Sequence, residues 1–464
     1  MLFSSIPFLY YFLPAVLVCY FLAPARAKNA VLLLFSLLFY GWGEPRYLLV
    51  MLLAAGLGYG FGLGLGYAKA PALRKALLVL SVGTSLAVLI WFKYADFFLE
   101  NANALLGTAF PLLGLALPVG ISFYTFQIFS YTVDVYRGQA EPQKNPIDLF
   151  CYVTLFPQLI AGPIVRYTEV AGQLKSRVST LADLRQGAAR FLVGLGKKVL
   201  LANLLGELCA AWRSTQDGSV LFSWLYAVGF MLHIYFDFSG YSDMAIGLGR
   251  MFGFSFPENF HYPYVSRSIT EFWRRWHISL GSWFRDYVYI PLGGSRRGRA
   301  VQLRNILIVW LLTGFWHGAA WNFLCWGLYF AVLLGAEKLF LGKLLQRRST
   351  VGRLYTLLAV LFGFVLFDAS TLAGAWQCIR GMLGFGNLPL VSQEGLYLLR
   401  SNAELLLIAA LGATPLPKRA LAKLEGRLPK LTAILEPLAL CALLLLCTAY
   451  LVDGSYNPFL YFRF

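Results

Sequence analysis

The 464-residue chain is 59% hydrophobic and only 13% charged, whereas a soluble domain carries roughly 25% charged residues. Its net charge of +17 comes largely from Lys and Arg in short connections between apolar runs, which is the positive-inside pattern of membrane proteins rather than a sign of nucleic-acid binding. Apolar runs recur from Pro7 to Val452, without the alternating, roughly ten-residue segments of a β-barrel. The composition therefore excludes a soluble protein and predicts an all-α, polytopic membrane protein.

The first apolar run, from Pro7 to Ala23, resembles a signal peptide because the letters APARA at its end imitate a cleavage site. No basic region precedes it and further apolar runs follow at once, so we interpret it as a retained transmembrane helix. Two apolar segments fit between most successive basic loops, and at roughly 20 residues each they predict about 11–12 transmembrane helices with extracytoplasmic N- and C-termini. The basic loops expected inside the cell are residues 25–28, 67–75, 136–144, 250–304, 337–353 and 417–430.

Residues 145–167 are apolar but too interrupted to form one transmembrane helix. Pro157 and Gly162 lie inside this segment, with further prolines on both sides, and both residue types disfavour a helix interior. Irregular backbone at membrane depth is tolerated only inside protein or beside water. We therefore predict a re-entrant element that lines a cavity. Residues 237–247 are unusually polar for a transmembrane segment and are expected to face the interior as well.

Residues 268–299 combine aromatic residues at helical spacing with a group of arginines. Ser268 followed by Glu271 is typical of a capping box at a helix start. In the helix that would follow, Trp273 and His277 share one face because they are four positions apart. The candidate phosphate-binding side chains in this stretch are Arg274, Arg275, Arg285, Arg296 and Arg297.

Two interpretations of these arginines remain open. In the first, the segment is an interfacial helix whose arginines reach lipid phosphates. In the second, it forms the mouth of a site for a phosphate-bearing donor, because the planar guanidinium group matches phosphate oxygens with two parallel hydrogen bonds. The letters GGSRRGR at the end of the stretch would add a flexible, basic lip.

His317 lies within the apolar residues 311–330. Ionisable groups inside apolar segments are costly and suggest function, although a neutral histidine can also hydrogen-bond a neighbouring helix. Small residues from Gly314 to Ala320 leave a surface that another backbone or a narrow acyl group could approach, and Trp316 and Trp321 could line a tunnel there. Near pH 7 a histidine can accept and return a proton, which suits a general base.

The remaining polar features indicate little further chemistry. His233 is expected to be structural, paired with Asp237 at i,i+4, and His261 to lie in a loop. The seven cysteines form no CxxC pairs, so neither a disulfide framework nor a metal site is predicted. The chain contains no long linker or clear repeat, and a single integral domain over 1–464 with an aromatic tail at 456–464 is the simplest prediction.

Five stretches carry a resemblance to a known family. They are LLLFSLLFYGWGEP, FPQLIAGPI, YFDFSGYSDMAIGLGRMFGF, FWRRWHISLGSWFRDYVYIPLGG and LLTGFWHGAAWNFLCWGLYF. Together they resemble the bacterial alginate-acetylation branch of the membrane-bound O-acyltransferases over nearly the whole chain. The resemblance implies a ring of helices around re-entrant segments, with a central tunnel between the two membrane faces.

The resemblance also implies roles for both histidines. The histidine of WHG, here His317, corresponds to the catalytic residue, and the histidine of RRWH, here His277, to the usual second polar residue of the site. The branch takes an acyl group, here expected to come from acetyl-CoA, and passes it outward across the bacterial cytoplasmic (inner) membrane. The acceptors are cell-envelope polymers such as alginate-like exopolysaccharide or peptidoglycan. The expected partner is an extracytoplasmic SGNH or esterase-like acetyltransferase, and no bound cofactor is expected.

The chain ends in the aromatic letters YNPFLYFRF. Since the tail is expected outside, Tyr461 is a candidate carrier of the acyl group. A phenol has a pKa near 10 and a thiol near 8.5, so an acetyl group moved from sulfur to this oxygen would stay activated for a second transfer. The alternative is an interfacial aromatic anchor with no covalent role.

Three alternatives to an acetyltransferase remain open from the sequence. One is an exporter of D-alanyl or another acyl group that takes its donor from a carrier protein. Another is a lipid or polysaccharide transporter in which the histidines only join helices. The third is a structural subunit that scaffolds a secretion complex.

Overall fold

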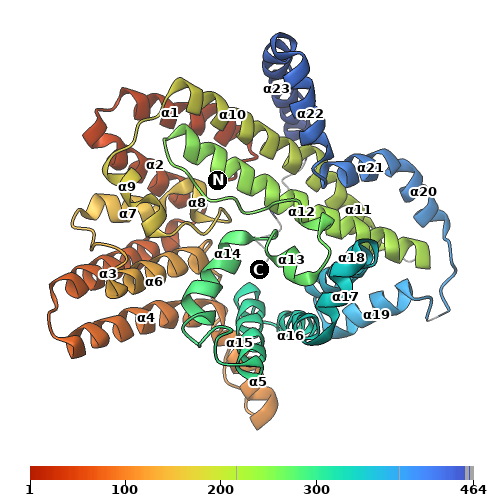
Figure 1. Ribbon diagram of the computed structural model, residues 1–464, viewed down its shortest axis with the longest axis horizontal. Helices are drawn as coiled ribbons and strands as arrows, with labels where there is room; N and C mark the ends of the chain where they lie inside the picture. The colour runs from red at the N-terminus through yellow and green to blue at the C-terminus, as the bar shows by residue number, and fades with distance from the viewer. Residues whose placement is uncertain (216, 386, 455–458, 460–464) are drawn as a thin grey trace. The chain divides into compact units, whose positions relative to one another are not determined.

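The computed structural model describes residues 1–215, 217–385, 387–454 and 459 (Figure 1). Within these ranges every regular element is a helix, and the strand-like pairing found there is one isolated antiparallel bridge between Phe260 and Trp276. The prediction of an all-α protein is confirmed.

The chain forms two compact units. The first unit comprises Met1–Phe191 and Tyr241–Pro257, and the second comprises Leu192–Gly240 and Glu258–Phe464. The boundaries between them fall inside helices α10 (Leu181–Gly196) and α12 (Val220–Met251).

The first unit is built on three helices that lie side by side, α3, α4 and α6 (Figure 1). A Cβ atom at Gly58 of α3 would lie 2.8 Å from a side-chain carbon of Ile128, and one at Gly62 would lie 2.4 Å from the hydroxyl oxygen of Tyr131. These glycines therefore allow α6 to approach α3 closely. The helices before α10 are η1 (Phe8–Phe12), α1 (Leu13–Leu22), η2 (Ala25–Ala27), α2 (Lys28–Gly43), η3 (Pro45–Tyr47), α3 (Leu48–Tyr67), α4 (Pro71–Lys93), α5 (Ala95–Leu106), α6 (Ile121–Arg137), α7 (Pro146–Thr154), α8 (Phe156–Leu159) and α9 (Tyr167–Lys175).

The segment 145–167 is broken, as predicted. Helix α7 ends at Thr154, α8 is only four residues long, and nearly all side chains from Leu149 to Val165 are buried. Side chains satisfy part of the irregular backbone: Ser36 Oγ accepts from Phe156 N at 3.1 Å, and the Tyr152 hydroxyl donates to Val165 O at 3.0 Å. The irregular backbone is thus packed inside protein, where it is tolerated.

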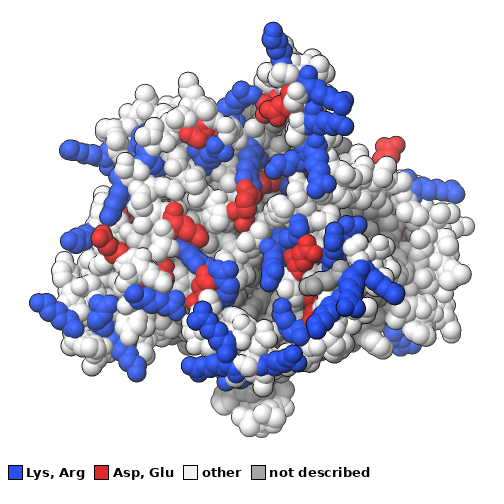
Figure 2. All heavy atoms as spheres, viewed as in Figure 1, with Lys and Arg blue, Asp and Glu red and all other residues white. Residues whose placement is uncertain are grey.

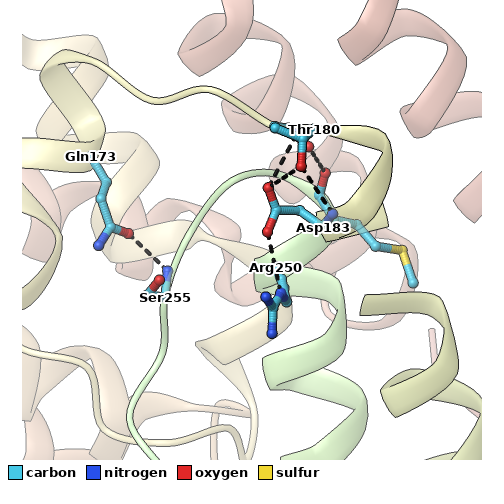
Figure 3. Close-up of polar contacts among 7 residues, drawn as sticks. Gln173, Thr180, Asp183, Arg250 and Ser255 are labelled. Carbon is cyan, nitrogen blue, oxygen red and sulfur yellow. Dashed lines mark hydrogen bonds and ion pairs between the residues drawn. The ribbon is translucent and has the colours of Figure 1, made fainter. Parts of the chain in front are cut away.

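Polar contacts tie the start of α10 to the end of α12 within the first unit (Figure 3). Thr180 N and Oγ1 donate to Asp183 Oδ2 at 3.2 and 2.6 Å, and Asp183 N donates back to Thr180 Oγ1 at 3.1 Å, which is a reciprocal helix cap. The other carboxylate oxygen of Asp183 accepts from Arg250 Nε at 3.3 Å. Gln173 Oε1 accepts from Ser255 N at 2.9 Å, which holds the chain just after α12 against the end of α9.

The second unit contains the two histidines singled out in the sequence. Its main feature is the antiparallel pair α15 and α16, against which α18 and the short α13 also pack. Its helices are η4 (Lys197–Ala202), α11 (Asn203–Ser214), η5 (Pro263–Val265), α13 (Ile269–Trp273), α14 (Ile278–Phe284), η6 (Arg285–Tyr289), α15 (Arg299–His317), α16 (Trp321–Ala336), η7 (Glu337–Leu341), α17 (Gly342–Arg347), α18 (Ser349–Asp368), α19 (Leu372–Met382), α20 (Gln393–Ser401), α21 (Ala403–Gly412), α22 (Leu416–Arg427) and α23 (Pro429–Asp453).

In the described part of the chain, six helices are long and apolar enough to cross a membrane, or up to seven if the bent pair α20 and α21 forms one span. The six are Pro45–Tyr67, Pro71–Lys93, Val220–Met251, Trp321–Leu345, Ser349–Asp368 and Pro429–Asp453. This count is below the about 11–12 transmembrane helices expected from the apolar segments between the basic loops. The difference arises because several apolar runs are divided into shorter helices, as at Gly318–Ala320 between α15 and α16.

Candidate functional site

A short antiparallel contact holds the loop that carries His277. His261 N donates to Arg275 O at 2.9 Å, and Ile278 N donates to Asn259 O at 3.0 Å, on either side of the Phe260–Trp276 bridge. These bonds require a turn at His277, whose φ of 46° and ψ of 54° lie in the left-handed region. Such a conformation is strained for a residue other than glycine and tends to occur at functional sites.

The expected single helix through Trp273 and His277 is therefore wrong. Ser268 Oγ does cap α13, accepting from Glu271 N at 3.0 Å, but α13 ends at Trp273 and α14 starts only after His277. The sequence pattern misses this break because the partner strand lies at residues 259–261, outside the periodic stretch.

The hydrogen bonds of Asn259 determine which nitrogen of His277 carries the proton. Asn259 Oδ1 accepts from Ser279 N at 3.2 Å and from Ser279 Oγ at 2.9 Å. A backbone N–H can only donate, so the orientation of the Asn259 amide is fixed and its oxygen is an acceptor. His277 Nδ1 lies 3.1 Å from the same oxygen and must donate. Nε2 of His277 therefore presents a lone pair.

Burial keeps this imidazole neutral. His277 is 3% exposed and lies outside the candidate membrane spans. Desolvation lowers the pKa of His277 to about 3, because a buried cation loses its hydration. Nε2 is buried and has no hydrogen-bond partner among the described residues. The result is a neutral histidine whose acceptor nitrogen is available to a substrate.

His317 is the last residue of α15 and is half-buried. Its ring centroid lies 5.2 Å from those of Trp326 and Phe367, each in an edge-on arrangement. The apolar run 311–330 had suggested a position inside one continuous helix. His317 instead lies at the turn of a helix hairpin, between α15 and α16. Aromatic rings around the imidazole limit the directions from which a substrate can approach.

The small residues near His317 serve helix packing. A Cβ atom at Gly314 would lie 2.3 Å from Phe323 O, and one at Gly327 would lie 2.3 Å from Trp310 O. The backbones of α15 and α16 therefore touch, which side chains at these positions would prevent. Of the two uses expected for these small residues, the close approach of another backbone is the one observed at Gly314.

Trp316 brings the two histidines together. Its ring centroid lies 6.2 Å from that of His277 and 5.0 Å from that of His317, and it is buried. Phe238 closes the other side of His277, edge-on at 4.7 Å. Trp321, expected beside Trp316, is instead 56% exposed at the start of α16.

Sequence reasoning missed three contributors to this site: Asn259, Trp326 and Phe367. Asn259 was the easiest of the three to find from the sequence, because it is a polar residue in the aromatic stretch NFHYPY. In the structure its side chain is fully buried. Trp326 and Phe367 look like ordinary apolar helix residues. Only the packing of α16 against α15, and of α18 against α16, brings them to His317.

The predicted phosphate-binding arginines fall into two groups. Arg275 and Arg285 form ion pairs with Glu271 at 2.9 Å and Asp286 at 2.6 Å. Arg274, Arg296 and Arg297 are exposed. Figure 2 shows Lys and Arg side chains gathered over the part of the second unit that contains α14, α15 and α17. Exposed arginines outside an ion pair can meet a phosphate or a lipid headgroup more readily than Arg285, which is exposed but paired with Asp286.

The other polar residues differ in their outcome. His233 Nδ1 contacts Ala202 O at 2.6 Å, and Asp237, its expected partner, accepts a hydrogen bond from Lys198 Nζ at 2.6 Å. His261 is exposed beside Arg275. Tyr461 lies outside the described residues. Among those that are described, no group of three or more His, Cys, Asp or Glu side chains could hold a metal ion.

Comparisons with known proteins identify relatives over the full chain. The chain is 39% identical to a probable alginate O-acetylase, AlgI, of Pseudomonas putida over 488 aligned residues that cover 100% of both proteins. It is 31% identical to a peptidoglycan O-acetyltransferase of Helicobacter pylori, across 100% of this chain and 98% of that protein. A teichoic acid D-alanyltransferase of Bacillus subtilis is 30% identical over 48% of this chain and 59% of its own length.

A family profile also matches the part of the chain that contains the candidate site. The profile of the membrane-bound O-acyltransferase family matches residues 139–373. This range contains both histidines, Trp316 and the basic loop at Arg296–Arg297. Together with the full-length relatives and the helices long enough to cross a bilayer, it establishes that the chain is a multi-pass member of the membrane-bound O-acyltransferase family.

Proposed function

We propose that this O-acyltransferase takes acetyl groups from cytoplasmic acetyl-CoA and passes them across the bacterial inner membrane for O-acetylation of a cell-envelope polysaccharide. The observation that carries the proposal is the pairing of His277 and His317 on either side of Trp316. A neutral acceptor nitrogen and a second imidazole in an aromatic surround suit the activation of a hydroxyl group for acyl transfer.

Acetyl-CoA is the proposed donor, bound as a substrate with no resident cofactor. Arg274, Arg296 and Arg297 are exposed, and guanidinium groups can bind the phosphates of CoA. The positive-inside pattern supports a cytoplasmic location for these arginines, which is where acetyl-CoA is available.

His317 is the proposed general base. It removes the proton of the acceptor hydroxyl as that oxygen attacks the thioester carbonyl. The new C–O bond forms, the C–S bond breaks, and the proton passes from His317 to the departing CoA sulfur. His277, with its Nδ1 proton held by Asn259, orients the hydroxyl through a hydrogen bond to Nε2.

Tyr461 is the proposed first acceptor and would carry the acetyl group as a phenyl ester. This ester then passes its acetyl group to an extracytoplasmic SGNH or esterase-like transferase, and the phenol regains its proton. The final acceptor is an alginate-like exopolysaccharide or peptidoglycan. The names of the full-length relatives, an alginate O-acetylase and a peptidoglycan O-acetyltransferase, support this class of acceptor.

The test is incubation of purified protein in lipid vesicles with acetyl-CoA labelled in its acetyl group. We expect CoA release and labelled protein, with the label on Tyr461 in peptide mass spectra. His317→Ala should reduce CoA release by about 10²–10⁴-fold, whereas His261→Ala, an exposed histidine of the same unit, should not. Tyr461→Phe should abolish protein labelling. CoA release by His317→Ala at the wild-type rate would refute the assignment of the base.

A D-alanyl exporter is the second candidate, because the chain also resembles a teichoic acid D-alanyltransferase over half its length. That activity would take its acyl group from a carrier protein, so D-alanyl-carrier thioester is the competing donor in the same assay. Consumption of this thioester with acetyl-CoA left intact would favour the second candidate. Membership of an acyltransferase family argues against the transporter and scaffold alternatives.

A further inference from the structure

The second unit contains a fully buried ion pair outside the histidine site. Lys198 Nζ lies 2.6 Å from Asp237 Oδ1, and the two side chains are 0% and 3% exposed. Removing two charges from water is expensive, and a buried ion pair is often no more stabilising than apolar side chains of similar size. A contribution to stability is therefore a weak explanation for its presence.

Two local features bring these charges together. Lys198 lies in η4, a π-helical turn that continues α10, and such turns are frequent at functional sites. Gly240 of α12 allows the second helix to approach, because a Cβ atom there would lie 2.9 Å from Gly194 O and 3.2 Å from Lys198 N. Asp237 lies just before this close contact, on the same helix.

Phe459, which lies six positions into the segment after α23, packs on the same lysine. Its ring centroid lies 4.4 Å from Lys198 Nζ, and the side chain is 1% exposed. Helix α23 also packs against η4, and a Cβ atom at Gly196, just before η4, would lie 3.0 Å from Leu443 of α23. A desolvated ammonium group over an aromatic face is a favourable cation–π arrangement.

The ion pair is also next to the histidine site. Asp237 is followed by Phe238, whose ring is edge-on to His277 at 4.7 Å. The position that binds Lys198 and the position that packs on His277 are thus consecutive on α12. Phe238 therefore connects the helix that carries Asp237 to the histidine site.

We propose that Lys198 and Asp237 form a docking pair for the C-terminal segment, which they hold through Phe459. Asp237 fixes the ammonium group, and the ammonium group binds the face of the Phe459 ring. The pair is a positioning device: it does not touch the acyl group, but it holds the segment that carries Tyr461. This role in transfer rests on the proposed function of Tyr461, whereas docking of the segment does not.

Docking is tested by carboxypeptidase digestion of the full-length protein in detergent, followed by intact mass spectrometry. Trimming of the wild-type chain should stop before Phe459, because this residue is buried. Phe459→Leu keeps an apolar side chain but removes the aromatic face, and trimming past this position should become at least about tenfold faster, since a desolvated cation–π contact is worth about that factor or more. Phe459→Trp should restore protection because Trp provides the strongest cation–π face.

Lys198 and Asp237 are best removed together, because one buried charge without the other would destabilise the fold. The double variant Lys198→Met with Asp237→Leu should keep its unfolding temperature and lose protection of the tail. Phe340→Leu, a change at a phenylalanine that is 67% exposed, is the matched control and should behave as wild type. Unchanged trimming of both Phe459→Leu and the double variant would overturn the docking pair.

The positioning role is tested by labelled acetyl-CoA with the same variants. Phe459→Leu should lower kcat for acetyl transfer at least about tenfold with little change in KM for acetyl-CoA, since donor binding is untouched, and Phe459→Trp should restore it. Loss of tail protection with normal kcat would overturn the positioning role. Absence of acetyl transfer in the wild-type protein would instead refute the proposed function, and the digestion result would still decide whether the pair docks the tail.

Discussion

At the scale of single residues, the sequence predicted the two histidines but not the group that orients one of them. His277 and His317 stand out because ionisable side chains are rare in apolar surroundings. Asn259 is distant from His277 along the chain, and only the 259–261 contact with 275–278 brings its oxygen to Nδ1. Sequence periodicity reports on neighbours along one helix, so a partner supplied by a separate loop is not visible to it.

Asn259→Ala should therefore impair the reaction through His277. Without the acceptor oxygen, Nδ1 no longer has to carry the proton, and the tautomer with a lone pair on Nε2 is no longer enforced. We expect kcat for acetyl transfer to fall by about tenfold or more, with KM for acetyl-CoA nearly unchanged, and stability to fall by about 1–3 kcal/mol because buried donors lose their acceptor.

Steady-state kinetics on labelled acetyl-CoA, together with thermal unfolding in detergent, would measure both effects. Asn402→Ala is the control, since the Asn402 side chain donates to Leu398 O and Ser401 Oγ at the junction of α20 and α21. A loss of stability with an unchanged kcat would show that Asn259 merely supports the fold.

At the scale of elements, helical segments were predictable and their ends were not. Composition identified the helices, because long apolar runs in a membrane protein have few other options. The breaks depended on contacts from elsewhere: the left-handed turn at His277 and the turn that ends α15 at His317. Both predicted site histidines lie at such breaks, where side chains are held in place without being enclosed by a regular helix.

The contact between α15 and α16 should be the most sensitive helix pairing near the site. At Gly314 a Cβ atom would lie 2.3 Å from a backbone oxygen, which cannot move aside as a flexible side chain could. Gly314→Ala should therefore lower stability by about 1–3 kcal/mol through overpacking, and activity should fall because His317 follows on the same helix.

Gly83→Ala in α4 is the matched control, because no atom lies within 4 Å of a Cβ atom there. This change should be neutral or stabilise the protein by about 0.5–1 kcal/mol, since alanine favours a helix. Thermal unfolding of both variants would decide the comparison. Equal stability of the two would mean that the close backbone contact is not part of the folded protein in the membrane.

The loop that contains Arg296 and Arg297 is the element that the donor should meet first. Reversing both charges, Arg296→Glu with Arg297→Glu, should raise KM for acetyl-CoA more than it lowers kcat, because only binding of the donor is weakened. The control is Lys418→Glu with Arg419→Glu, an exposed basic pair on α22. If both double variants give the same kinetics as wild type, the arginines of the loop belong to the lipid-facing interpretation.

At the scale of the whole molecule, the family was predictable from the sequence, whereas the number of membrane crossings stays a prediction. The resemblance rested on motifs spread over the chain, and the full-length relatives confirm it. Counting apolar runs gave more crossings than the six or seven helices that meet the criteria of length and apolarity in the described residues. A run such as 311–330 looks like one span by composition, yet it turns at Gly318, and short helices packed inside protein need no lipid-length segment.

The direction of transfer gives the last prediction, because it depends on the topology of the entire chain. The basic loops 250–304 and 337–353 are expected on the cytoplasmic side, and acetyl-CoA, a charged molecule, does not cross a sealed bilayer. Inverted membrane vesicles, which expose the cytoplasmic face, should therefore consume external acetyl-CoA, whereas right-side-out vesicles should do so only after permeabilisation. Vesicles with His317→Ala provide the background in both orientations. Consumption by intact right-side-out vesicles at the rate of inverted ones would place the donor site on the outer face and reverse the proposed direction of transfer.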